Sequence, residues 1–442
     1  MAGVRKFQDI MTYSRSTTGT YIGRDGLIKT AAADEARFEY DDSGNLHGLL
    51  LEPERTNQLQ RSAVISGTGW GTSGATATNL NENYLGVFPG CTVTSGGADW
   101  HRIENNASAF VTSARDYAVT VWVKSGTSGK VRIVLRNTGN ANETIVSGTF
   151  GSISQTSSAY GGTSRIREYN LGNGIYRIQF RWDCNAAATL NLGIGPESTT
   201  NGQTVIALGA QVEEGAFPTS YVPSTGSAGT RQQDIAYIDI DQFGVKQDRG
   251  TFVVEYNNMD WYTTGTSSPQ YQATVQFGNI TDTSDRLTVP YIYKTGNRLF
   301  NEIITDGSGH FSQDVIDYAD SADVGPFSGK IALRYDETSA RHAVDGVLGT
   351  DDTSVNIEGT NPFRSRIAFR ALANSADGEG EDIKFHIKTL KYYPRKVSDQ
   401  ELYNLTGGVG TYTPPGVSAN TITLRDGSYL QDRAGNYIET RA

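Results

Sequence analysis

Short segments in which apolar and polar residues alternate recur through most of this 442-residue chain. In the segment 117–124, Val119, Val121 and Val123 share one face, and Trp122 falls on the other. This period of two is typical of a half-buried β-strand. Windows rich in Ala, Glu, Lys and Leu, which would favour long helices, are scarce. Because the alternating segments follow one another with no helix between them, we expect an all-β chain built of antiparallel β-sandwiches.

Turn residues separate these segments and support hairpin connections. Glycine supplies 50 of the 442 residues, which is above its usual share of roughly 7%. Asn173-Gly174 joins the segment 165–169 to the segment 174–182, and Asn-Gly is the strongest short signal of a β-hairpin. The composition therefore agrees with many strands connected by tight turns.

One helix is expected, at the end of the last long block of strands. Ser398 and Glu401 have the spacing of a capping box, and Leu402 and Leu405 follow on one side of the predicted helix. The helix is therefore expected to pack those two leucines against a sheet.

The chain divides into five parts by composition and turn signals. The first and last parts contain strand candidates but too few apolar residues to fold alone, so we expect them to pair with another chain or with a larger particle. The parts are an extended N-terminal attachment segment (1–60), a first sandwich (61–224), a linker (225–249), a second sandwich (250–406), and a further linker with a short β-hairpin tail (407–442).

Charge and hydropathy exclude several classes of protein. The formal net charge is −10, and no basic stripe suggests binding to nucleic acid. No apolar run is long enough to insert into a membrane. The N-terminus has no apolar signal region, so we expect synthesis in the cytoplasm. Cys91 and Cys184 are too few for a disulfide scaffold, and we expect both to be free thiols.

Two groups of segments resemble known families. Residues 15–33, 36–41 and 48–57 resemble a segment that recurs in bacteriophage head-spike, head-fibre and tail-fibre proteins. In that family it precedes a jelly roll similar to carbohydrate-binding modules, whose closing strand resembles residues 208–223. Residues 331–335, 344–346 and 390–402 resemble parts of a laminin-G-like or concanavalin-A-like jelly roll.

The resemblance implies a structural protein of a phage virion, with both sandwiches folded as lectin-like jelly rolls. It implies a fibre or spike, on head or tail, that adheres to host surface glycans without catalysis. The implied partners are other virion proteins, host cell-surface polysaccharide and further copies of the chain, because fibre proteins of this kind are usually homotrimers. The protein would be made in the host cytoplasm, released by lysis and located in the virion. The alternatives are a virion-associated polysaccharide depolymerase, a mainly structural head-fibre or decoration protein, and a bacterial sugar-binding protein, which the missing signal peptide disfavours.

Catalytic motifs give no support for an enzyme. A nucleophile elbow such as GxSxG is absent from the sequence. Glu213 and Glu214 are adjacent on a predicted strand and point to opposite faces, so they cannot form the carboxylate pair of a glycosidase. We therefore expect a protein that is not an enzyme, with no catalytic residues.

Aromatic residues are the more promising candidates for a glycan site. Trp122 lies opposite the core face of its strand, beside Thr120 and Lys124. An exposed Trp among polar neighbours suits stacking against a sugar ring. The alternative is that Trp122 packs under the N-terminal segment or against a neighbouring subunit, since large aromatics often mark contact surfaces.

Metal binding has one weak candidate. Asn374, Asp377, Glu379 and Asp382 lie in an acidic, loop-like stretch with oxygen ligands of the kind that Ca²⁺ prefers. The spacing is not that of an EF-hand, and a solvated loop explains the same charges. Apart from possible Ca²⁺, we expect no cofactor.

Overall fold

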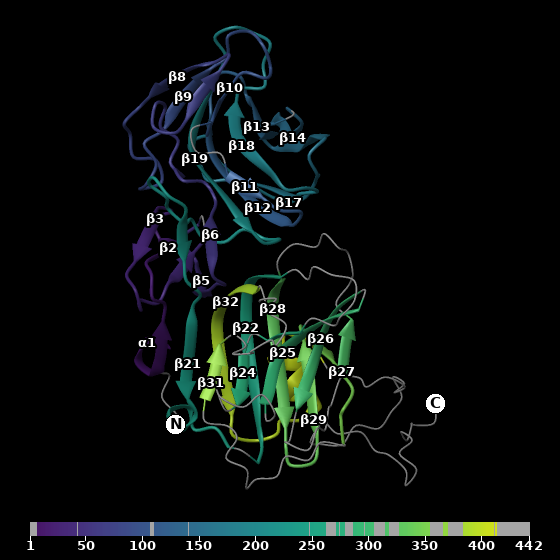
Figure 1. Cartoon of the computed structure of the whole chain (residues 1–442). Coiled ribbons are helices and arrows are strands. Elements are labelled where there is room, and N and C mark those ends of the chain that lie inside the picture. Colours follow the sequence, from purple (N-terminus) through teal and green to yellow (C-terminus); the bar gives the residue numbers. More distant parts are fainter. Residues whose placement is uncertain are drawn as a thin grey trace.

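The computed structural model describes residues 7–41, 43–106, 110–139, 141–246, 248–261, 271–273, 275–278, 286–295, 297–304, 314–317, 327–353, 366–369, 383–410 and 412. Strands account for 55% of the structure and helices for 4%, which confirms the predicted all-β class. Two β-sandwiches lie one above the other, and the N-terminal segment runs along one side of both (Figure 1).

The first sandwich is formed by two antiparallel sheets that face each other across one core. One sheet has the order β15-β14-β13-β18-β10-β7, with β11 also paired to β18. Its strands are β7 (Gly71–Ser73), β10 (Arg102–Glu104), β11 (Phe110–Thr112), β13 (Lys130–Asn137), β14 (Glu143–Thr149), β15 (Ser152–Ser158) and β18 (Ala188–Gly195). The other sheet has the order β16-β17-β12-β19-β6-β20, and β9 joins β8 to β19. Its strands are β6 (Arg55–Asn57), β8 (Thr76–Asn79), β9 (Cys91–Thr94), β12 (Asp116–Ser125), β16 (Gly162–Asn170), β17 (Ile175–Asp183), β19 (Thr204–Glu214) and β20 (Gly229–Arg231).

The second sandwich has the same antiparallel construction. One sheet has the order β30-β29-β28-β22-β32-β5-β4. Its strands are β4 (Phe38–Tyr40), β5 (Leu46–Leu51), β22 (Gly250–Trp261), β28 (Phe327–Tyr335), β29 (Ala340–Val344), β30 (Val347–Leu348) and β32 (Ile383–Tyr393). The other has the order β1-β21-β31-β24-β25-β26-β27, with β23 paired to β25. Its strands are β1 (Met11–Ser14), β21 (Ile235–Asp239), β23 (Tyr271–Ala273), β24 (Val275–Gly278), β25 (Arg286–Thr295), β26 (Asn297–Ile304), β27 (Asp314–Asp317) and β31 (Arg366–Phe369).

The N-terminal segment pairs within its own chain, which corrects the expectation that it needs another chain. After the short helix α1 (Phe7–Ile10), β1 extends one sheet of the second sandwich by pairing with β21. β5 pairs with β32 and so brings Leu49 and Leu51 into the second core. β6 pairs with β19 and β20 of the first sandwich. The remaining hairpin, β2 (Gly19–Ile22) with β3 (Ile28–Ala31), lies between the two sandwiches (Figure 1).

The stretch predicted as a linker, 225–249, also contains paired structure. β20 and β21 both lie in it and belong to different sandwiches, and the short helix α2 (Ile240–Phe243) follows β21. A composition rich in Gly and Ser therefore marked a crossover between sheets rather than a free connection. The boundaries of the five parts stay a prediction, and the predicted hairpin tail lies outside the described residues.

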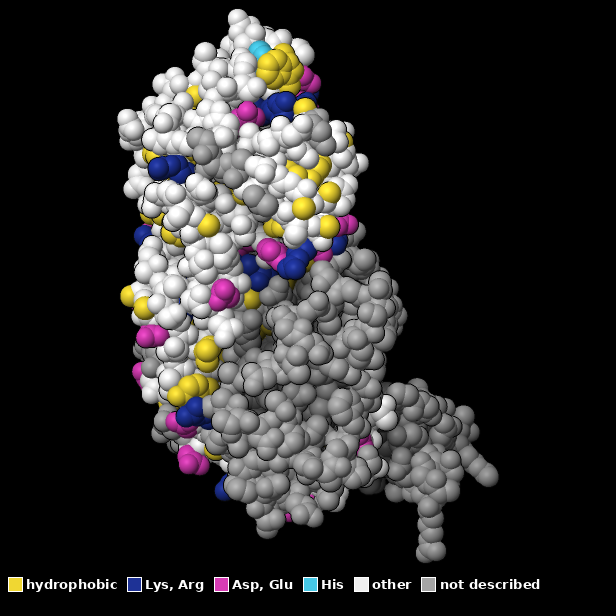
Figure 2. Space-filling model, viewed as in Figure 1, with side chains coloured by type: hydrophobic (Ala, Val, Ile, Leu, Met, Phe, Trp, Pro, Cys, Tyr) yellow, Lys and Arg dark blue, Asp and Glu magenta, His cyan; other side chains and the backbone are white. Residues whose placement is uncertain are grey.

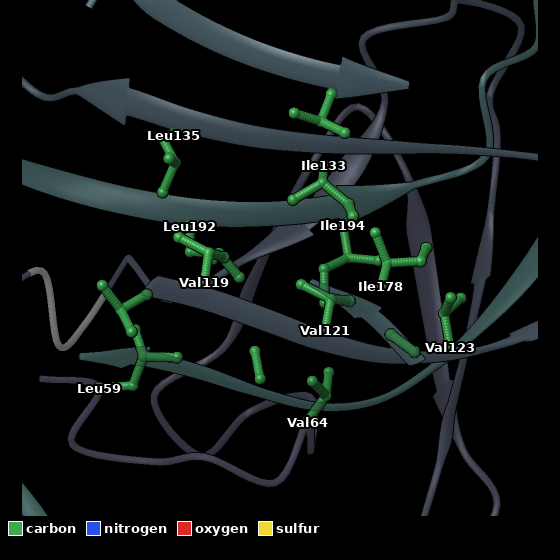
Figure 3. Packing of buried hydrophobic residues seen from close by; sticks show 14 of the residues in the cluster. Leu59, Val64, Val119, Val121, Val123, Ile133, Leu135, Ile178, Leu192 and Ile194 are labelled. Atoms are coloured by element: carbon green, nitrogen blue, oxygen red, sulfur yellow. The ribbon is translucent and has the colours of Figure 1, made fainter. Parts of the chain in front are cut away.

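The core of the first sandwich is built from the alternating residues of both sheets. Val119 and Val121 of β12 face Ile133 of β13 and Ile194 of β18, and all four are buried (Figure 3). This confirms the predicted core face of β12. The opposite face of β12 is also buried as far as Trp122, so the strand is not half-buried as its alternation predicted.

The two strongest local signals in the sequence are confirmed. β16 and β17 form the predicted hairpin, and Asn173 and Gly174 in its turn both have positive φ, at 52° and 74°. The helix α3 (Asp399–Leu405) begins at Ser398, whose side chain accepts a hydrogen bond from the Glu401 N–H at 3.2 Å. In the described part of the chain, helices are too short and too polar to cross a membrane.

Candidate functional site

A buried cluster of charged side chains fixes the N-terminal segment between the two sandwiches. Arg37 Nη1 lies 2.8 Å from Glu52 Oε2, and its other terminal nitrogen contacts Asp234. Arg15 Nη1 lies 3.1 Å from Asp234 Oδ1, and Arg231 Nε lies 3.6 Å from Glu52 Oε2. The side chains of all five are almost completely buried. Each of these charges has an opposite partner, so the cluster ties the N-terminal segment to the junction.

Beside this cluster lies a cavity of about 270 Å³, called here the inner cavity. The N-terminal segment, the first sandwich and the second sandwich each contribute walls. Charged side chains of both signs gather at the lower end of the first sandwich on the face shown in Figure 2. Its polar and aromatic lining includes Glu39, Asp41, His47, Glu52, Trp122, Arg167, Tyr169, Arg177, Gln179, Asn257, Asn258, Asp260, Ser328 and Lys384.

The first sandwich contributes the non-core face of β16, β17 and β12. Tyr169, Arg177 and Trp122 are direct neighbours across these three strands, so they form one row. In the next row, Gln179 Nε2 donates to Thr120 Oγ1 at 3.3 Å. The Arg177 guanidinium carbon lies 4.5 Å from the centre of the Tyr169 ring, which is a cation–π contact. An aromatic and cationic surface is thereby directed toward the cavity.

The second sandwich contributes a β-bulge. The register of β22 shifts after Tyr256, and Asn258 takes the left-handed conformation, with φ of 50°. The Asn258 N–H donates to Ser328 Oγ at 3.0 Å, and Ser328 Oγ donates to Asn257 Oδ1 at 2.8 Å. Such bulges redirect side chains and occur often beside binding sites.

Two arginines of β16 join the two sandwiches at the edge of the cavity. Asp260 of β22 accepts from Arg165 Nη1 at 2.9 Å and from Arg167 Nη1 at 3.1 Å. Arg165 also has positive φ, at 52°, where the register of β16 shifts. Two irregular strand positions therefore meet across the junction, joined by ion pairs.

The N-terminal segment contributes an acid–histidine pair. Glu39 Oε2 lies 2.8 Å from His386 Nε2, and Glu39 Oε1 accepts from the Ile22 N–H at 3.1 Å. Burial opposes ionisation of Glu39, but the hydrogen bond and charge of His386 outweigh it and lower the pKa of Glu39 to about 2. His47 lies edge-on to His386, with ring centres 5.4 Å apart. Burial and the neighbouring His386 lower the pKa of His47.

A wider hollow of about 790 Å³, called here the outer groove, adjoins the inner cavity. The two share Gly26, Leu85 and Leu171 in their walls. Lys124 Nζ lies 5.2 Å from the centre of the Tyr84 ring in the outer groove. Burial and a hydrogen bond with Glu82 raise the pKa of Tyr84 to about 12. The rest of the outer groove consists of Arg24, Asp25, Leu27, Ser43, Gly44, Asn83, Asn173 and Ile175.

The structure separates the three predicted glycan-binding residues. Trp122 is only 3% exposed, so the expectation of an exposed platform is wrong. Its ring packs on Phe88 and Tyr221, with centres 5.2 and 5.3 Å away, and belongs to a cluster that includes Ile28. It therefore packs under the N-terminal segment, which was the stated alternative. Thr120 is fully buried, whereas Lys124 lines the outer groove.

The metal and thiol candidates have different outcomes. Asn374, Asp377, Glu379 and Asp382 lie outside the described residues, so the Ca²⁺ site stays a prediction. Where the structure is described, no three His, Cys, Asp or Glu side chains are grouped as metal ligands would be. Cys91 and Cys184 are both buried and unpaired with each other.

Sequence reasoning missed Arg177, Tyr169, Glu39 and Lys384. One signal in the sequence could have identified Arg177. It lies in β17, where polar and buried apolar residues alternate: Arg177, Gln179 and Arg181 with Ile178, Phe180 and Trp182. A polar row of this kind on the same face as Trp122 marks a hydrated surface or a site. Nothing local in the sequence places Glu39 or Lys384 beside it, because they come from other sheets.

Comparisons with known proteins give low-similarity structures only. No family model and no curated protein matches the sequence. The NanB sialidase of Streptococcus pneumoniae is 14% identical, with a TM-score of 0.29, over 42% of this chain and 28% of that chain. The CBM22 tandem domain of Xyn10C from Paenibacillus barcinonensis is 10% identical, with a TM-score of 0.24, over 78% and 98%. Domains LG4-5 of the mouse laminin α1 chain are 10% identical, with a TM-score of 0.21, over 77% and 96%.

These likenesses contradict the prediction that the chain is not an enzyme. NanB is a sialidase, and a sialidase of Trypanosoma rangeli and a GH43 protein of Bacillus licheniformis are also among the similar structures. The prediction is withdrawn on that finding. At such identities and TM-scores the likenesses transfer no activity or ligand to this chain, and the resemblance to phage fibres and spikes stays a prediction.

Proposed function

We propose that the protein is a glycan-binding component of a phage fibre or spike, and that the outer groove and inner cavity together form its glycan site. The observation that carries the proposal is the adjoining pair of hollows: Tyr84 and Lys124 line the outer groove, and Arg177, Tyr169 and Asn257 line the inner cavity. The resemblance of residues 15–33, 36–41, 48–57 and 208–223 to phage fibre and spike proteins supports a location in the virion.

The chemistry of the outer groove suits a sugar chain. A sugar ring has an apolar C–H face and a rim of hydroxyl groups. Tyr84 is half-buried and supplies an aromatic surface, and the exposed Asn83, Asn173 and Arg24 supply hydrogen-bonding groups beside it. Pockets that combine an apolar wall with a few placed polar groups are typical of small-molecule sites.

Binding of purified host polysaccharide to Tyr84→Ala tests the proposal. A central aromatic contact contributes roughly 2 kcal/mol or more, so we expect binding to weaken at least tenfold in a variant that circular dichroism shows to be folded. Trp100→Ala is the matched control, because Trp100 is 45% exposed and lies outside both hollows. If Trp100→Ala abolishes binding and Tyr84→Ala does not, the glycan site lies at Trp100 and the proposal fails.

The virion setting is part of the same proposal. We propose that three copies of the chain form a homotrimer, and that this homotrimer binds other virion proteins. Immunogold labelling of intact phage particles tests the location, and light scattering tests the assembly. Absence of label from the particles, together with a monomer at micromolar concentration, would refute the virion location and the homotrimer. The proposed glycan binding would be unaffected.

A further inference from the structure

The inner cavity is lined by charges that are not equally satisfied. Four carboxylates line it, and each already accepts hydrogen bonds from the protein. Glu39, Glu52 and Asp260 bind the groups described above. Asp41 accepts from the Asn45 N–H at 2.8 Å and from Asn45 Nδ2 at 3.0 Å. The negative charges of the cavity therefore have partners.

The cations that line the cavity are less well matched. Arg177 forms no ion pair with a carboxylate of the described chain, and its buried Nε makes no hydrogen bond there. Lys384 Nζ donates to the Pro218 carbonyl at 3.3 Å and has no carboxylate within ion-pair distance among the described residues, although its charge helps to lower the pKa of Glu39 and of Glu52. Arg167 binds Asp260 through Nη1, while its buried Nη2 has no partner in the same part of the chain.

We infer that the inner cavity binds a sugar ring that carries a carboxylate, and that Arg177 and Lys384 are the groups that attract this carboxylate. The inference rests on the proposed function and names the class of ligand. Arg177 and Lys384 are half-buried, so each cation is partly removed from water, and an anionic ligand can supply the ion-pair partner that neither has among the described residues. Hydrogen bonds between guanidinium or ammonium groups and a carboxylate are among the stronger ones in proteins.

The size and shape of the cavity agree with a single ring. Its volume of about 270 Å³ falls just below the range of roughly 300–1,000 Å³ found for drug-sized ligands. On one wall the Arg177 guanidinium lies over the Tyr169 ring, so both groups border the space that a sugar ring would occupy. The outer groove shares three wall residues with the cavity and can hold the neighbouring sugars of the chain.

Matched pairs of ligands test the inference on the full chain. The probes are glucuronic acid with glucose, galacturonic acid with galactose, and N-acetylneuraminic acid with its methyl ester, titrated by NMR. We expect at least one acid to bind about tenfold or more tightly than its neutral partner. That preference should fall with added salt, because screening weakens charge–charge attraction. Equal binding of every acid and its neutral partner would overturn the inference while leaving glycan binding intact.

The variant Arg177→Gln separates recognition from folding. Loss of one hydrogen bond to a charged group weakens binding roughly ten- to hundredfold, so the preferred acid should lose that much affinity and its neutral partner almost none. Lys130→Gln, which removes an exposed lysine of β13, is the matched control and should change neither. Equal weakening of acid and neutral ligands by Arg177→Gln would overturn the inference. If no probe and no host polysaccharide binds the wild type, the proposed function fails with it.

Discussion

Asp234 is the residue whose charge the junction depends on most. It contacts Tyr13, Arg15 and Arg37, and it also accepts from the Glu52 N–H at 2.8 Å. Asp234→Asn keeps the shape of the side chain but removes its charge. The buried arginines would then share the single carboxylate of Glu52. Because the Asp234 side chain has no exposed surface, solvent cannot screen the charges that remain.

Removing one partner of a buried ion pair costs about 3–5 kcal/mol, since it leaves an uncompensated charge. We therefore expect Asp234→Asn to lower the free energy of unfolding by that amount in urea at neutral pH. Proteolysis within residues 1–57 should also accelerate, because Arg15 and Arg37 anchor this segment. Glu214→Gln is the control: the Arg115–Glu214 pair is 65% and 45% exposed, and such pairs contribute at most about 1 kcal/mol. If Asp234→Asn lowers the free energy of unfolding no more than Glu214→Gln does, the buried cluster does not stabilise the junction.

Three further changes have defined outcomes. Glu39 has a pKa of about 2 against an ordinary value of 4.5, so its ionised form stabilises the fold fully above pH 4.5, and this stabilisation disappears as the pH falls toward 2. Between these pH values the wild type should lose about 3 kcal/mol more stability than Glu39→Gln, as measured by unfolding at each pH. Trp122→Ala should cost about 3–5 kcal/mol of stability, as expected for a buried Trp, and a nearly unchanged melting temperature would contradict its burial. Deleting residues 1–57 removes Leu49 and Leu51 from the second core, so circular dichroism and melting should show a destabilised second sandwich, and an unchanged melting curve would count against the β5–β32 pairing.

Local signals in the sequence predicted local structure well. The alternation around Val119 and Val121 identified a core face, and Asn173-Gly174 and Ser398 identified a hairpin and a helix start. These features depend on neighbours along the chain, so a short window contains the information. The burial of Trp122 could not be predicted in this way, because it depends on whether a segment distant in the sequence covers that face of the strand.

The candidate site was largely invisible to the sequence for the same reason. Its walls come from the N-terminal segment and both sandwiches, and its charged groups meet only after the sheets pair. Glu39 and His386 are 347 residues apart, yet they form one pair. The weak apolar content of residues 1–60 correctly indicated that this segment needs a partner surface. It could not indicate that the surface belongs to the same chain.

The proposed function depends on binding of glycan in the outer groove and the inner cavity. The most direct test is a crystal structure of the protein grown with oligosaccharide fragments of the host surface polysaccharide. We expect electron density for sugar rings against Tyr84 and Lys124 in the outer groove, with an acidic ring continuing into the inner cavity beside Arg177. Sugar bound elsewhere on the chain, with these two hollows free of it, would show that they are not the glycan site.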